Sequence, residues 1–322
     1  MTRTPVGTLA AWLAIAACLF PAWAAAQPFP SRPIRLIVPY PPGGNTDIVA
    51  RLYGQKLAER IGQPVIFDNR GGAAGTLGLG AAAKSPNDGY TLSIGDLGSM
   101  VIAKFANPNV TYDPQKDFAP VGLVSAVSIV VTANPKSPAN NIGEFIALAR
   151  AQPGKLTYGS SGVGAPGHLA FELLRSMTKI DIVHVPFKGG AQAVTALIGE
   201  HVDVLADGAA FAQVKAGRLK ALAVTGPRLP ALPDVPGIGE SVPGFSFTNW
   251  WGILAPAGTP PEAVGRLSEE LRQIAASPEI GERLNSLGLA PQSSTPQQFA
   301  DHIRTETEKV GRIVREAGIK FE

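Results

Sequence analysis

The chain of 322 residues is poor in several residue types, and the scarcest is cysteine. Its one cysteine, Cys18, lies in an N-terminal segment that we expect to be removed on export. The remaining chain would carry no thiol, which excludes a disulfide framework, a cysteine metal site and a thiol nucleophile. An exported chain without cysteine also disfavours redox chemistry, so we expect no cofactor and no metal.

Charge is scarce as well. Charged residues make up 16% of the chain, and the 28 lysines and arginines are scattered, with no basic run. Nucleic-acid binding needs a concentrated basic face, so we expect no nucleic-acid partner despite the net charge of +3. The hydrophobic fraction of 45% predicts a globular protein with a substantial core, and 36 glycines and 29 prolines predict many loops.

The N-terminus has the pattern of a secretory signal. Arg3 gives a short positive region, residues 6–20 are almost entirely apolar, and Pro21 ends the run. Small residues at A-x-A spacing follow, which predicts cleavage after Ala26. Two alternatives remain open: an uncleaved anchor helix, and a lipoprotein whose anchor is Cys18. Later in the chain no segment approaches 18 uninterrupted apolar residues, so we expect a soluble mature protein.

The rest of the chain alternates short apolar strands with amphipathic helices. A strand at 34–38 is followed by a loop and a helix at 47–61, and the pattern repeats through strands at 65–67 and 90–94. This alternation predicts an α/β fold with a mostly parallel sheet. A capping box at 295–298 marks the start of the last helix.

Two long β-prone segments, 121–131 and 219–224, are suited to pass between domains. Two α/β units joined by two crossing segments predict a two-lobed protein with a hinge and a cleft between the lobes. We divide the chain into a signal peptide (1–26), lobe 1 (27–127), lobe 2 (128–222) and a return to lobe 1 (223–322). In such architectures ligands bind at the carboxyl ends of the strands.

The segment GSSGVGAPGH (residues 159–168) contains G-x-G-x-x-G, which is typical of dinucleotide binding. The context does not fit, because the match lies in the middle of the chain and not in its first strand-to-helix turn. The loop PYPPGGNTD (39–47) has the same design, since it also lies between a strand and a helix. Unpaired backbone N–H groups at a helix N-terminus suit an anion, so the two loops together predict an anion held between lobes.

Side chains in both loops add hydrogen-bond donors. Ser160 and Ser161 carry hydroxyls in the second loop, as Asn45 and Thr46 carry polar groups in the first. Pro166 fits a first helical turn, where its missing N–H has no consequence. The alternative is that both loops are ordinary glycine turns with capping residues.

Catalytic patterns are weak. GSSG is not G-x-S-x-G, and the four histidines are dispersed, so an exported hydrolase using Ser160 or Ser161 with His168 is a minor alternative. We expect His168 to steady the serine loop. Asp207 either faces the cleft or caps the turn after it. Trp250 and Trp251 are candidates for a pocket wall, and for Trp251 the core is an equal alternative.

Many segments in order resemble the substrate receptors of tripartite tricarboxylate transporters, also called Bug receptors. The resemblance covers essentially the whole mature chain. The segments that carry it are FPSRPIRLIVPYPPGGNTDIVAR, IGQPVIFDNRGGAAG, PNDGYTLSIG, YDPQKDFAPVGLV, AQPGKLTYGSSGVGAPGHLA, HVPFKGGAQAVTALIGEHVD, AGRLKALAVTG, LPALPDVPGIGE and WWGILAPAGTP.

This resemblance implies a periplasmic, two-lobed fold of the type II binding-protein kind, with no enzymatic activity. It implies a monomer that captures a small organic anion (a di- or tricarboxylate, an acidic amino acid or an aromatic acid) and passes it to membrane transporter subunits. A ligand sensor for a signalling partner is the alternative. The ligand-binding candidates are Tyr40, Pro42, Gly43, Gly44, Asn45, Thr46, Asp47, Gly95, Ser99, Ser160, Ser161, Gly162, Gly164, Ala165, His168, Lys188 and Asp207.

Three departures from the family pattern bear on the ligand. Ala165 stands where relatives often have Ser or Thr, so one hydroxyl contact is missing. Residues 205–206, before Asp207, are smaller than usual, and the following loop (208–213) looks shortened. Residues 99–109 also depart from the usual pattern. These changes affect the identity of the ligand and the depth of the pocket.

Overall fold

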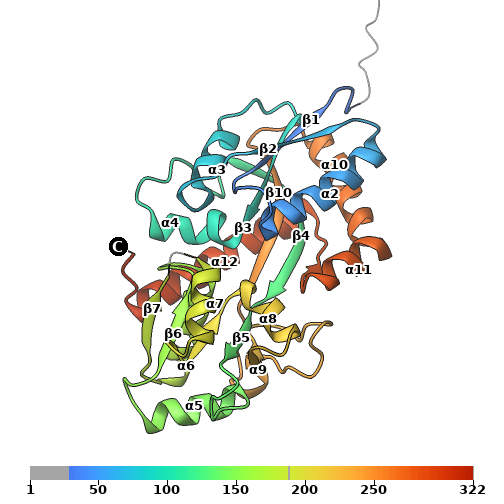
Figure 1. Cartoon of the computed structure of the whole chain (residues 1–322). Coiled ribbons are helices and arrows are strands. Elements are labelled where there is room, and N and C mark those ends of the chain that lie inside the picture. Colours follow the sequence, from blue (N-terminus) through green and yellow to red (C-terminus); the bar gives the residue numbers. More distant parts are fainter. Residues whose placement is uncertain (1–28, 188, 322) are drawn as a thin grey trace, which may run out of the picture.

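The structure is a computed structural model that describes residues 29–187 and 189–321. The expected signal peptide, Cys18 and Lys188 therefore lie outside the described residues. Two sheets, each covered by helices, form two lobes that are joined by extended segments (Figure 1). We call the larger sheet with its helices lobe 1 and the smaller one lobe 2.

The sheet of lobe 1 has the strand order β11-β4-β10-β3-β1-β2. Its strands come from both halves of the chain, because β10 inserts between β3 and β4. The strands are β1 (Ile34–Val38), β2 (Val65–Asn69), β3 (Thr91–Asp96), β4 (Phe118–Ser128), β10 (Thr248–Pro256) and β11 (Ala290–Pro291).

The sheet of lobe 2 has the order β7-β6-β8-β5-β9. The chain enters it directly from β4 and leaves it through β9. The strands are β5 (Val130–Ala133), β6 (Thr157–Ser160), β7 (Val183–Pro186), β8 (Val204–Ala206) and β9 (Lys220–Val224).

The expectation of a mostly parallel sheet is wrong, because both sheets are mixed. In lobe 1, β10 is antiparallel to both β3 and β4; in lobe 2, β5 is antiparallel to both β8 and β9. β10 and β5 each enter their lobe from the hinge and so run away from the cleft. The strands that lead into cleft loops run towards it, and β1, β2 and β3, like β6, β7 and β8, pair in parallel.

The helices follow the apolar patterns. In the amphipathic helix α10 (Pro261–Ala275), Val264, Leu267, Leu271 and Ile274 are buried as predicted. The capping box at Thr295 begins α12, where the Thr295 hydroxyl accepts from the Gln298 amide and the Gln298 side chain accepts from the Thr295 amide. The remaining helices of eight or more residues are α2 (Asn45–Ile61), α3 (Thr76–Ala83), α5 (Ile142–Ala151), α6 (Pro166–Thr178), α7 (Gly190–Ile198), α11 (Pro278–Ser286) and α12 (Pro296–Ala317).

The C-terminal helix α12 connects the two lobes. It packs against β4 in lobe 1 and against α6 in lobe 2, and it lies between them in Figure 1. One hydrophobic core therefore runs from Phe145 and Leu169 of lobe 2 to Phe299 and Ile303 of α12. A second core, around Tyr53 and Trp251, belongs to lobe 1 alone.

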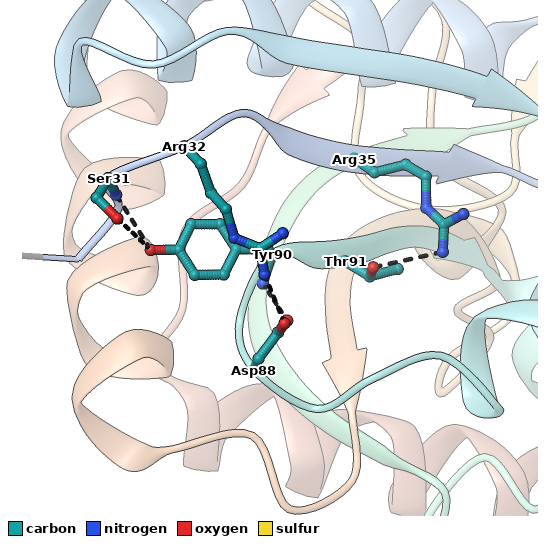
Figure 2. A network of polar contacts seen from close by, with 6 residues as sticks. All are labelled: Ser31, Arg32, Arg35, Asp88, Tyr90 and Thr91. Atoms are coloured by element: carbon teal, nitrogen blue, oxygen red, sulfur yellow. Dashed lines mark hydrogen bonds and ion pairs between the residues drawn. The ribbon is translucent and has the colours of Figure 1, made fainter.

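The first described residues are tied to the far end of lobe 1 (Figure 2). The Arg32 guanidinium lies 4.0 Å from the centre of the Tyr90 ring and 2.7 Å from the Asp88 carboxylate. The Tyr90 hydroxyl is also bonded to Ser31, through the backbone amide and the side chain. These contacts fix the start of β1, which leads into the loop of residues 39–44.

Over the ranges that the structure describes, no helix is both long and apolar enough to span a bilayer.

Candidate functional site

Two adjoining cavities lie between the lobes. The larger, of ≈ 460 Å³, is walled mainly by lobe 1, and the smaller, of ≈ 190 Å³, mainly by lobe 2. Asn45, Pro166 and Asn249 line both cavities. The two volumes are therefore parts of one cleft, which we call the interlobe cavity. Its wall includes the first residues of α2 and of α6.

The N-terminus of α2 is open to the cavity. Gly44 occupies the N-cap position and supplies no side chain to cap the helix. The backbone N–H groups of Asn45, Thr46 and Asp47 have no acceptor among the described residues. Such free N–H groups and the helix dipole place partial positive charge at the cavity wall.

The Asp47 carboxylate holds this loop from behind. It accepts hydrogen bonds from the Gly43 amide (2.9 Å), from Arg51 Nε (2.9 Å) and from Asn69 Nδ2 (2.9 Å). Burial alone would raise the pKa of the Asp47 carboxyl, but the bonds from Arg51, Asn69 and Gly43 lower it below its ordinary value. Asp47 is therefore charged at neutral pH and committed to the loop, and its side chain is not part of the cavity wall.

A second carboxylate, Asp96, lies on the wall at the end of β3. Its Oδ1 accepts from the Tyr40 hydroxyl (3.1 Å) and from the Ser99 amide (2.8 Å) and hydroxyl (2.7 Å). Its Oδ2 accepts from the Thr46 hydroxyl (3.3 Å), whose oxygen in turn accepts from Trp251 Nε1 (2.9 Å). Burial raises the pKa of the Asp96 carboxyl above its ordinary value. This network fixes the Tyr40 and Thr46 side chains in the wall.

In lobe 2, neutral rings hold the glycine loop. The Ser160 hydroxyl is fully buried and lies 2.7 Å from His184 Nε2, and the Gly164 amide donates to His168 Nδ1 at 3.0 Å. The two imidazole rings stack with centroids 4.0 Å apart. Burial, helped by neighbouring His168 and Arg175, lowers the pKa of His184 to about 4, and burial also lowers that of His168. His168 therefore steadies the serine loop, as predicted from the sequence.

Two of the three glycines of the G-x-G-x-x-G match, Gly164 and Gly167, have a structural role that does not involve a nucleotide. Gly164 has φ +78, and a Cβ there would meet the Phe321 ring at 2.8 Å. At Gly167 a Cβ would lie 1.8 Å from the Ala206 carbonyl oxygen, because α6 starts directly against the end of β8. These glycines thus bring the N-terminus of α6 close to the sheet and into the cavity wall. Ala165, the N-cap residue of α6, supplies no side-chain hydrogen bond to cap the helix. The Gly167 and His168 amides have no acceptor among the described residues.

A serine hydrolase does not fit this geometry. Ser160 and His184 form a hydrogen-bonded pair, but the serine is 0% exposed, so no substrate reaches its oxygen. The buried acid Glu172 accepts from the Tyr158 hydroxyl and pairs with Arg175, and it makes no hydrogen bond to His184 among the described residues. The pair lies behind the cavity and supports the loop.

The cavity wall also contains residues that the sequence candidates omit. Asn249 at the start of β10 lines both parts of the cavity, and its Oδ1 is buried without a partner in the described chain. Trp251, Pro166 and Asp96 line the larger part. The position of Asp96 at the carboxyl end of a strand is a signal that sequence reasoning can use; Asn249 gives no such signal, because it arrives from the other half of the chain.

The predicted candidates fall into three groups. On the wall lie Tyr40, Pro42, Gly44, Asn45, Thr46 and Asp207. The lining of the two parts does not include Gly43, Asp47, Gly95, Ser99, Ser160, Ser161, Gly162, Gly164, Ala165 or His168. Lys188 is outside the described residues. Asp207 combines both of its expected roles, since it lines the smaller part of the cavity and accepts from the Ala209 amide at 2.9 Å.

In the described ranges no three His, Cys, Asp or Glu side chains are grouped in a way that could hold a metal ion.

Comparison with protein families gives a match over most of the chain. Residues 49–319 match the family described as the tripartite tricarboxylate transporter family receptor. A similar protein, the UPF0065 protein in the tcbD-tcbE intergenic region of Pseudomonas sp. (strain P51), is 39% identical over 293 residues, 89% of this chain and 87% of the relative.

Solved structures give the same picture. The chain is 34% identical to R. palustris Rpa4515 with adipate, with TM-score 0.80 over 90% of this chain and 99% of the other. It is 32% identical to the periplasmic binding protein BugD, with TM-score 0.75 over 91% and 99%. It is 31% identical to MatC (Rpa3494) from Rhodopseudomonas palustris with bound malate, with TM-score 0.74 over 89% and 100%.

Proposed function

The chain belongs to the tripartite tricarboxylate transporter receptor family, and from that premise we propose that it is a periplasmic receptor that captures a small carboxylate. Family members and structural relatives are solute-binding proteins, and two of the relatives hold adipate and malate. The ligand class proposed here is a small di- or tricarboxylate, with an acidic amino acid or an aromatic acid as the other members of the range.

One observation carries the proposal: two helices without a capping side chain end at the same cavity. Among the other helices, α5, α11 and α12 have a capping side chain (Asn141, Ser277 and Thr295), whereas α3, α7 and α10 have none. At the cavity the caps are Gly44 and Ala165, which leave the backbone N–H groups free. An anion satisfies these groups and the two helix dipoles at once, so a carboxylate supplies what the free protein lacks.

The polar side chains on the wall support orientation of the ligand. Asn249 lies at the junction of the two parts of the cavity; its Oδ1 is buried and is an acceptor, so only its Nδ2 can donate to a carboxylate. The Tyr40 and Thr46 hydroxyls already donate to Asp96, so they are fixed donors and not adaptable ones. We propose that the ligand carboxylate lies at the helix N-termini and that its other end contacts Asn249.

Closure of the lobes completes the binding. Asn45 of lobe 1 already approaches Gly208 of lobe 2, since a Cβ on Gly208 would lie 3.7 Å from Asn45 Nδ2. A ligand that touches both helix N-termini binds the closed form better than the open form, and so shifts the population towards closure. We propose that the closed form is presented to the membrane subunits of the transporter, without covalent chemistry.

Export follows from the N-terminal pattern. We propose that residues 1–26 are a cleaved signal peptide, that lobe 1 comprises 27–127 with 223–322, and that lobe 2 comprises 128–222. The contact of α12 with α6 fits this division only if α12 acts as a bridge between the lobes. We also propose that the receptor is a monomer.

A thermal-shift screen tests the proposal. Adipate and malate are compared with adipamide and malamide, which keep the shape of each acid but lose its charge. A ligand that binds only the native state raises the melting temperature, and we expect the acids and not the amides to do so. Equal shifts for acids and amides, or a shift only with a sugar or cation, would refute the anion proposal.

A further inference from the structure

The C-terminal end of the chain lies between the two lobes. Helix α12 stops at Gly318, which has φ 62, and the Ile319 amide then donates to the Val314 carbonyl at 3.0 Å. A left-handed glycine after the last turn bends the chain back, and an apolar residue beyond it packs on the helix. The last described residues, 319–321, which we call the C-terminal strap, lead to a place beside α4 (Ala103–Ala106) of lobe 1 (Figure 1).

The Phe321 ring of the strap covers the glycine loop of lobe 2. Gly164 in that loop is buried and has φ +78, and a Cβ there would lie 2.8 Å from the ring. The same point is 3.6 Å from the Ala106 Cβ atom of α4. A residue without a side chain is what lets the ring approach the backbone this closely. The strap, the loop of lobe 2 and α4 of lobe 1 therefore meet at one place.

The two neighbours of the ring belong to different lobes. Helix α4 is part of lobe 1, and its Phe105 packs on α12, where a Cβ at Gly311 would lie 3.1 Å from the Phe105 ring. Gly164 follows β6 and belongs to lobe 2. If the lobes separate, the Phe321 ring loses either Gly164 or α4. The three-way contact is therefore complete only when the lobes are closed.

The covered loop is the one that leads to the cavity wall. The Gly164 amide donates to His168 Nδ1, Ala165 is the N-cap of α6, and Pro166 lines both parts of the interlobe cavity. Phe321 lines neither part, so its ring does not touch a ligand in the cavity. Its contact with the loop acts on the ligand only through the position of the α6 N-terminus.

We propose that Phe321 is a positioning residue for ligand binding, which holds the loop before α6 against lobe 1 and favours the closed form before a ligand enters. The inference rests on the proposed function, in which closure completes the binding. A binding-competent form that is only partly populated reduces the apparent affinity by its fraction. Loss of the ring therefore raises the open population and weakens binding of the acid in proportion.

The test measures the distance between the lobes without ligand, by double electron–electron resonance. Spin labels at Gln55→Cys in α2 and Lys155→Cys in lobe 2 replace exposed side chains, and the protein without its signal peptide has no other cysteine. We expect Phe321→Ala to raise the ratio of open to closed molecules about tenfold, because an aromatic ring buries a large apolar area for a single side chain. Deletion of residues 319–322 should have the same effect.

The matched control is a ring on a glycine within one lobe. Phe29 lies on Gly89, which has φ +86, and a Cβ there would lie 2.9 Å from the ring. Both residues belong to lobe 1, so Phe29→Ala removes a similar contact and should leave the distance between the lobes unchanged. The proposal is overturned if the folded strap variants keep the wild-type distances, or if Phe29→Ala opens the lobes as much. It is also overturned if neither strap variant folds, because the strap would then be part of the core.

Adipate and malate, added to the labelled wild type, test the proposed function separately. We expect the acid that binds to increase the closed population, and to bind Phe321→Ala about tenfold more weakly. If neither acid changes the distances, the proposed ligand class fails, while the distances in the ligand-free variants still decide the role of Phe321.

Discussion

The loop before α2 and the loop before α6 lead a helix N-terminus to the same cavity, but different side chains hold them. In lobe 1 the supports are carboxylates, Asp47 under the loop and Asp96 beside it. In lobe 2 they are a serine and two stacked neutral imidazoles. Both arrangements leave the helix N–H groups free for a ligand. The comparison indicates that the free N–H groups are the feature that the two loops share. Different side chains hold the loop in each lobe.

The two loops also differ in how much space they leave. At Gly167 in lobe 2 an added Cβ would lie 1.8 Å from the Ala206 carbonyl oxygen, whereas at Gly44 in lobe 1 it would meet nothing within 4 Å. We therefore expect Gly167→Ala to lower the free energy of unfolding by about 3 kcal/mol or more. Gly44→Ala should cost no more than about 1 kcal/mol, the range of a lost N-cap preference. Urea denaturation of the two variants measures both values, and similar losses would remove the contrast.

The side chains that hold the two loops should differ in how their contribution to stability changes with pH. The pKa of His184 is about 4 in the folded protein, against an ordinary value of 6.5, so between these values the unfolded chain binds more protons. Stability supplied by the neutral ring is complete above pH 6.5 and falls as the pH falls towards 4. We expect a loss of about 2 kcal/mol over this window, less than the full equivalent of the shift because the ring is only partly buried.

His184→Gln removes this titration and keeps a hydrogen-bonding group near Ser160. Its unfolding free energy should depend less steeply on pH between 6.5 and 4 than that of the wild type. Some slope should remain, because burial lowers the pKa of His168 too. Parallel pH profiles for the wild type and the variant would show that the imidazole pair does not carry the acid sensitivity of lobe 2.

The smallest expected effect on stability comes from a substitution at Ala165. The residue has the extended backbone of an N-cap (φ −62, ψ 152) but no side-chain acceptor. Ala165→Ser supplies an oxygen for the Gly167 or His168 amide and should raise the free energy of unfolding by about 1 kcal/mol. Thermal unfolding without ligand measures this gain, and an unchanged stability would mean that these amides are not free in solution.

The sequence predicted the parts of the site that depend on local patterns. Strand, glycine loop and helix in order placed both helix N-termini at the carboxyl ends of strands, and the structure confirms this for α2 and α6. Local patterns do not tell which hydroxyl faces the cavity. Ser160 ends β6, next to β7 in the sheet, and that register brings His184 within reach of its hydroxyl.

The sequence also did not predict which distant segments contribute residues to the cavity wall. Asn249 and Trp251 reach the wall because β10 inserts antiparallel between β3 and β4, with Trp251 opposite Asp96. No spacing in the sequence encodes that register, and the expectation of a mostly parallel sheet pointed away from it. The choice between pocket and core for Trp251 thus required the strand order.

The measurement that tests the central claim most directly is calorimetric titration of adipate and malate into Gly44→Asp. The new carboxylate caps α2 and places a negative charge where the ligand carboxylate would lie, without a clash. At about 5 Å and an effective dielectric constant of about 20, this repulsion is about 3.3 kcal/mol, which corresponds to a loss of affinity of about 250-fold. Ser277→Asp adds the same charge at the N-terminus of α11, away from the cavity, and is the matched control.

We predict that Gly44→Asp is at least as stable as the wild type in the absence of ligand and loses binding of whichever acid the wild type takes, while Ser277→Asp binds normally. Wild-type affinity in a stable Gly44→Asp would contradict the claim that the free N–H groups of α2 hold the carboxylate.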